Sequence, residues 1–130
     1  MKRSLQIALL ITALIPLALG VMNLFFGAAA FVPADQITPS LDNQLRFYAV
    51  WFTVVFFLIV WCVRNLEIAG PVMRIVFIVM ALGGVARLFS IAQFGVPDPT
   101  MIGAIVIEIG VLAFIPWHNA YLRRLPAVPA

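Results

Sequence analysis

The sequence predicts an all-α integral membrane protein, a four-transmembrane-helix bundle, from its composition and from the layout of its apolar residues. Of the 130 residues, 65% are hydrophobic and only 10% are charged, whereas a soluble domain is about half apolar and about a quarter charged. A soluble chain of this length could not bury so much apolar surface. The apolar residues also form four continuous runs, each long enough for a helix to cross the ~30 Å apolar layer of a bilayer.

Short segments rich in proline, glycine and polar residues separate the four runs. We predict spans over residues 5–26, 43–63, 72–94 and 101–122, within a single membrane domain of residues 1–130. The separating segments carry Pro33 and Pro39, then Gly70 and Pro71, then the sequence GVPDP, all typical of turns. Strands of a membrane β-barrel would alternate apolar and polar residues, and these runs are continuous, so helices are favoured.

The first run also resembles a secretory signal peptide, because Lys2 and Arg3 precede an apolar stretch. The apolar core of a signal peptide has about 7–15 residues. Here the apolar stretch continues to Phe26. We therefore interpret it as a first span that is retained.

Basic residues predict the orientation of the spans. With four spans, six of the eight basic residues fall on one side of the membrane: Lys2, Arg3, Arg64, Arg74, Arg123 and Arg124. The positive-inside rule then places both termini and the loop between the second and third spans in the cytoplasm.

Two charged residues lie inside the apolar runs. Arg87 has no charged neighbour within ten residues on either side, and Glu108 lies in the fourth run. A charge near the bilayer centre costs about 2.5–3.5 kcal/mol or more unless it is paired or hydrated. Counted along their helices, Arg87 and Glu108 reach similar depths in the outer half of the membrane. Because their charges are opposite, we predict that they form an ion pair, with Gly83 and Gly84 allowing a neighbouring helix to approach.

Other polar residues are predicted to gather near this pair, and they define a polar cluster. Its members are Arg87, Glu108, Arg46, Asp42, Asn43, Ser90 and Gln93. Three interpretations stay open: a structural lock between helices, an outward-facing ligand pocket, and snorkelling of the basic side chains to the head groups. Asp42 and Asn43 also suit the N-cap and first turn of the second span.

Several chemistries find no support in the sequence. Cys62 and His118 are the only residues of their types, too few for a zinc or haem site of the usual kind. No phosphate-binding glycine loop or nucleophile elbow is present, and the basic pairs are too small to hold nucleic acid. We therefore predict no catalytic residue, metal or cofactor, and we interpret His118 as an interfacial histidine. Asn23 is interpreted as an interhelical hydrogen-bonding group.

Two segments carry a resemblance to a known family. LDNQLRFYAVWF opens the second span, GGVARLFSIAQFGVPDP ends the third, and Glu108 follows in the fourth. Together they resemble DUF4345, a bacterial family of unknown function. The resemblance covers nearly the whole chain and implies a small, multi-pass protein of the bacterial inner (cytoplasmic) membrane. It implies no activity, substrate or cofactor.

Three functions fit these observations. The first is a non-enzymatic binding or accessory protein, whose polar cluster meets a small-molecule or lipid ligand or a membrane-protein partner. The second is a small proton-coupled transporter using Glu108, and the third is a membrane enzyme acting on a lipid-phase substrate. We favour the first, because pairing with Arg87 suits structure or anion binding better than acid chemistry. The lipid bilayer is the expected surrounding, and no nucleic acid is expected.

Overall fold

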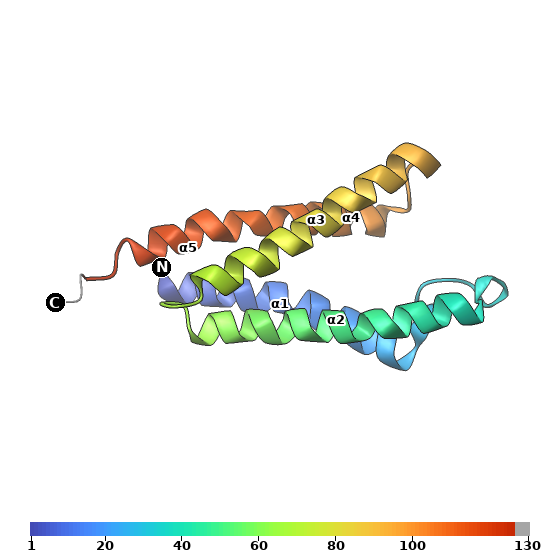
Figure 1. Ribbon diagram of the computed structural model, residues 1–130, viewed down its shortest axis with the longest axis horizontal. Helices are drawn as coiled ribbons and strands as arrows, with labels where there is room; N and C mark the ends of the chain where they lie inside the picture. Colours follow the sequence, from blue (N-terminus) through green and yellow to red (C-terminus); the bar gives the residue numbers. More distant parts are fainter. Residues whose placement is uncertain (127–130) are drawn as a thin grey trace. The chain divides into compact units, whose positions relative to one another are not determined.

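The computed structural model describes residues 1–126, so the last four residues of the predicted domain lie outside it. The described residues form helices and no strands (Figure 1). The main elements are α1 (Lys2–Phe25), α2 (Pro39–Arg64), α3 (Gly70–Phe94), α4 (Pro99–Gly110) and α5 (Phe114–Leu122). Short 3-10 turns cover Gly27–Ala30, Ala34–Gln36 and Val111–Ala113. Four helical segments are long and apolar enough to cross a membrane, the fourth being Pro99–Leu122. The four predicted helices are therefore confirmed.

The helices begin a few residues earlier than the sequence predicts. At α2, the Thr38 hydroxyl accepts a hydrogen bond from the Leu41 N–H at 3.2 Å, and Pro39 occupies the first helical position, a favourable place for proline. Asp42 and Asn43 are therefore not the N-cap of this helix, and that part of the interpretation is wrong, whereas the predicted acidic residue in the first turn is confirmed for Asp42. At α4, the Asp98 carboxylate accepts from the Thr100 N–H at 2.9 Å and the Met101 N–H at 3.4 Å.

The fourth predicted span is interrupted near its middle. The 3-10 turn Val111–Ala113 separates α4 from α5. Pro116 explains the interruption, because proline lacks the N–H that an α-helix uses and its ring clashes with the carbonyl four residues earlier, here that of Leu112. In contrast, α1 stays α-helical through Pro16.

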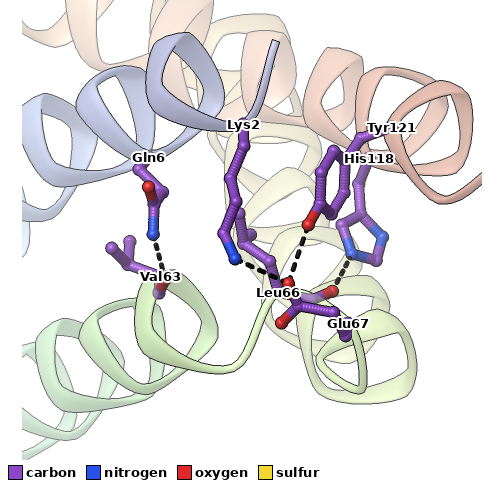
Figure 2. Close-up of polar contacts among 7 residues, drawn as sticks. All are labelled: Lys2, Gln6, Val63, Leu66, Glu67, His118 and Tyr121. Atoms are coloured by element: carbon purple, nitrogen blue, oxygen red, sulfur yellow. Dashed lines mark hydrogen bonds and ion pairs between the residues drawn. The ribbon is translucent and has the colours of Figure 1, made fainter. Parts of the chain in front are cut away.

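The chain divides into two compact units, and the division falls inside α1. The α1–α2 unit contains Gln6–Arg64, and the α3–α5 unit contains Met1–Leu5 together with the chain from Asn65 onward. Within the α1–α2 unit, the two helices approach closely at Gly20. A Cβ atom on this glycine would lie 2.9 Å from the Thr53 hydroxyl oxygen. Gln6 Nε2 donates to the Val63 carbonyl oxygen at 3.0 Å near the other end (Figure 2).

Within the α3–α5 unit, α3 and α4 lie side by side (Figure 1). The first two-thirds of α3 carries its buried side, made of Gly70, Met73, Val76, Phe77, Ala81 and Gly84. Most of them are three or four residues apart, which places them along one helix face. The Phe77 ring stacks on Phe114 of α5 at 5.3 Å between centroids. From Val85 to Phe94, every residue is exposed or half-buried.

Candidate functional site

Arg87 and Glu108 form a two-point ion pair within the α3–α5 unit. Arg87 Nε donates to Glu108 Oε2 at 2.9 Å, and Nη2 donates to Oε1 at 3.1 Å. The planar guanidinium and the carboxylate thus meet edge to edge, the geometry that makes arginine–carboxylate pairs strong and specific. The predicted ion pair is confirmed.

Two glycines of α3 explain why the pair can form here. A Cβ atom on Gly84 would lie 2.9 Å from Ile109 Cγ1 and 3.2 Å from Glu108 Cβ. Only glycine therefore lets α4 approach this closely without a shift. At Gly83 a Cβ atom would lie 3.9 Å from Glu108 Oε2, an ordinary contact. Arg87 lies one turn beyond these glycines on α3, and its side chain reaches the Glu108 carboxylate.

The Arg87 guanidinium has hydrogen-bonding capacity beyond Glu108. Nη1 lies 3.6 Å from Met101 Sδ, and a thioether sulfur is a weak acceptor. The three contacts use three of the five N–H groups of the guanidinium. The Arg87 side chain stays 37% exposed, and that of Glu108 20%. The pair is therefore open on one side, with N–H groups on Nη1 and Nη2 able to meet a further acceptor.

The other predicted members on α3 do not join the pair directly. Ser90 and Gln93 follow Arg87 by one and nearly two turns, and both are exposed. Among residues 1–126, the Arg87 side chain bonds to Glu108 and Met101 rather than to either of them. They line the exposed part of α3 on which Arg87 lies.

Asp42 and Arg46 form a second ion pair, in the α1–α2 unit. Arg46 Nε donates to Asp42 Oδ2 at 2.8 Å, and Nη1 donates to the Leu24 carbonyl oxygen at 2.6 Å. Asp42 Oδ1 accepts from the Ala28 N–H at 2.9 Å. A cation on the last carbonyls of α1 also complements the helix dipole. This pair therefore fastens the end of α1 to the first turns of α2.

Gly27 allows that attachment. Its φ angle is +54°, a backbone conformation that residues with a Cβ rarely adopt. A Cβ atom on Gly27 would also collide with the Asp42 carboxylate. Asn43, the neighbour of Asp42, is exposed. The two ion pairs belong to different units, and a single cluster of all seven polar residues stays a prediction.

The chain also matches a known protein family. A family model described as "Domain of unknown function (DUF4345)" matches residues 4–118, nearly the whole chain. The chain belongs to the DUF4345 family. The resemblance seen in the sequence is thus confirmed, and the DUF4345 match includes Arg46, Arg87 and Glu108. No curated protein and no solved structure matches the chain.

Sequence reasoning missed a third polar group of this DUF4345 chain, around the connection between α2 and α3 (Figure 2). Glu67 Oε1 accepts from Lys2 Nζ at 2.7 Å and from the Tyr121 hydroxyl at 2.8 Å. The Lys2 ammonium, followed by the Tyr121 hydroxyl, lowers the pKa of Glu67 from 4.5 to about 2. The sequence did offer one indication of this group, because Glu67 is a single acidic residue among the basic residues on the predicted cytoplasmic side.

His118 belongs to the same group and is buried within the protein, while its predicted place at the membrane interface stays a prediction. It is only 1% exposed, and its Nε2 lies 2.6 Å from the Leu66 carbonyl oxygen (Figure 2). Because a carbonyl oxygen can only accept, Nε2 carries a proton and donates it. His118 therefore fixes the α2–α3 connection to α5.

Asn23 also differs from its predicted interhelical role. Its Nδ2 donates to the Leu19 carbonyl oxygen of its own helix at 2.7 Å. The side chain is buried, and its Oδ1 has no hydrogen-bond partner among the described residues. The observed bond thus follows the local pattern in which a polar side chain returns to the carbonyl one turn earlier.

Proposed function

We propose that this DUF4345 protein is a non-enzymatic binding protein of the bacterial inner membrane, and that Arg87 binds the acidic head group of a lipid-like ligand. The observation that carries the proposal is the open side of the Arg87–Glu108 pair. The pair cancels its own net charge, yet the Arg87 side chain is 37% exposed, and one N–H group on each of Nη1 and Nη2 is not used by its contacts with Glu108 and Met101.

Such N–H groups are costly in an apolar environment. A polar group without a hydrogen-bond partner costs several kcal/mol in hydrocarbon. Arg87 lies seven residues before the end of α3, or about 10 Å along the helix axis, which is within reach of amphiphile head groups. A carboxylate or phosphate oxygen is the acceptor that best suits a guanidinium edge. The apolar side chains exposed nearby on α3, among them Leu88 and Phe89, suit the acyl part of such a ligand.

The same geometry supports binding over proton-coupled transport and over acid–base catalysis. Both carboxylate oxygens of Glu108 accept hydrogen bonds from Arg87. Exchange of a proton at Glu108 would first have to break this two-point contact. The basic residues near Lys2, Arg74 and Arg123 support an orientation in which both termini are cytoplasmic and Arg87 lies in the outer half of the membrane.

The test compares two amphiphiles of equal chain length in phosphatidylcholine nanodiscs. Oleate carries a carboxylate, whereas oleyl alcohol does not. We expect oleate to raise the thermal unfolding midpoint of the protein, by about 3–5 °C for each kcal/mol of binding free energy. Oleyl alcohol should leave the midpoint unchanged, because it lacks the charged acceptor.

The matched variant replaces both members of the pair, as Arg87→Gln with Glu108→Gln. Removing both charges avoids the penalty of leaving one buried charge without its partner. Oleate should no longer stabilise this double variant. Equal stabilisation of the double variant and the parent protein, or equal effects of oleate and oleyl alcohol, would show that Arg87 does not bind an acidic head group.

A further inference from the structure

One end of the α3–α5 unit carries a concentration of positive charge. We infer that this basic surface, formed by Arg3, Arg74, Arg123 and Arg124, docks the anionic phospholipid head groups of the adjacent membrane leaflet. All four residues are exposed. The inference is independent of the ligand proposed for Arg87, because it concerns other residues and the bulk lipid of the membrane.

The Arg74–Asn119 contact, and the places of the other three arginines in the chain, put these residues at the same end of the unit. Arg74 Nη2, in the first turn or so of α3, donates to Asn119 Oδ1 of α5 at 3.2 Å. Arg123 and Arg124 follow Asn119 by about one helical turn. Arg3 is next to Lys2, which is held beside Tyr121 of α5 by their shared bond to Glu67 (Figure 2).

Few acidic groups oppose this charge. Of the acidic residues in the α3–α5 unit, Glu67 lies at this end and is engaged by Lys2 at 2.7 Å. Glu108 is paired with Arg87. Asp98 is the N-cap residue of α4. Asn119 orients Arg74 through a neutral side chain, so the Arg74 charge is not cancelled. Among residues 1–126, no acidic side chain thus forms an ion pair with these four arginines, and their charges can meet an external anion.

The surroundings of these arginines favour a lipid surface as the partner. Trp117 is half-buried and lies on α5 about two turns before Arg123 and Arg124, and its ring stacks on Phe114 at 5.9 Å between centroids. Tryptophan and tyrosine concentrate where the apolar layer meets the head groups. Clusters of arginine and lysine directly beside a membrane helix bind anionic lipids. Charge complementarity at this depth points to phospholipid phosphates.

The experiment measures lipid preference directly beside the basic surface. In a Trp51→Phe, Trp61→Phe background, Trp117 is the only tryptophan. The protein is reconstituted into vesicles containing phosphatidylglycerol or phosphatidylcholine with brominated acyl chains, which quench tryptophan fluorescence on contact. We expect phosphatidylglycerol to be preferred over phosphatidylcholine beside Trp117. Each arginine that contacts a phosphate should contribute a factor of about five, so the total preference should be at least about five-fold.

A matched pair of variants separates charge from structure. One variant combines Arg74→Gln, Arg123→Gln and Arg124→Gln, and its preference for phosphatidylglycerol over phosphatidylcholine should fall towards a ratio of one. A second variant changes the same three residues to Lys, and it should retain the preference. In the parent protein, 0.5 M NaCl should weaken the preference, because salt screens exposed charges. This salt measurement tests the inference even where the Gln variant does not fold. Equal quenching by the two lipids, or a preference unchanged by salt, would overturn the inference.

Discussion

Replacing Gly84 by alanine should separate α3 from α4 at the ion pair. The new methyl group would lie 2.9 Å from Ile109 Cγ1 and 3.2 Å from Glu108 Cβ. Neither atom is at the flexible end of its side chain, so relief requires the two helices to move apart. Because Glu108 Cβ is one of the atoms pushed away, the bonds between Arg87 and the Glu108 carboxylate should lengthen as well.

The size of the effect follows from two opposing contributions. Forcing an extra methyl group into a packed contact costs about 1–3 kcal/mol. Alanine also gains about 1 kcal/mol over glycine in helix propensity. Gly83→Ala provides the matched control, because its Cβ would meet Glu108 Oε2 at an ordinary 3.9 Å and gains the same propensity. We therefore expect Gly84→Ala to be about 1–3 kcal/mol less stable than Gly83→Ala.

Unfolding of the two variants can be measured by titrating sodium dodecyl sulfate into dodecyl maltoside micelles and following the far-ultraviolet circular dichroism. The difference in free energy of unfolding between neighbouring variants cancels most effects of the micelle. If Gly84→Ala proves as stable as Gly83→Ala, then α3 and α4 do not pack closely at Gly84. In that case the glycine contact does not explain how Arg87 reaches Glu108.

Two further predictions concern the α2–α3 connection. His118→Phe should lower the free energy of unfolding by about 1–3 kcal/mol, because it leaves the Leu66 carbonyl without its donor; the same titration measures this, and an unchanged stability would contradict the bond. Because the pKa of Glu67 is lowered from 4.5 to about 2, its contacts stabilise the folded state above pH 4.5, and this stabilisation is lost as the pH falls towards 2. Between pH 5 and pH 2, the thermal midpoint of the parent protein should therefore fall towards that of the Glu67→Gln variant. A difference between the two midpoints that stays constant over this range would show that the Glu67 contacts do not stabilise the fold.

The sequence predicted those features that depend on composition and on counting along a helix. Four apolar runs sufficed to place four helices. The Arg87–Glu108 pair followed from opposite charge and similar depth, and depth is proportional to residue number within a helix. Pro116 could also have predicted the break before α5, because the effect of proline on the preceding turn is local.

Other features depended on how the chain turns between helices. Asp42 bonds to the Ala28 N–H only because the intervening loop returns the end of α1 to α2, and residue spacing does not determine such a path. The burial of His118 was missed for a related reason. Its partner is the carbonyl of Leu66, 52 residues away, and a backbone acceptor leaves no trace in the sequence.

The Glu67 contacts also bear on the order in which the protein folds. Arg46 meets Leu24 across only 22 residues, so the α1–α2 unit can complete this contact early in synthesis. Lys2 is 65 residues from Glu67, which is in turn 54 residues from Tyr121. Contacts between residues distant in sequence form slowly, and multi-part chains fold in the order of their synthesis. The group of Lys2, Glu67 and Tyr121 is therefore complete only when α5 has been made.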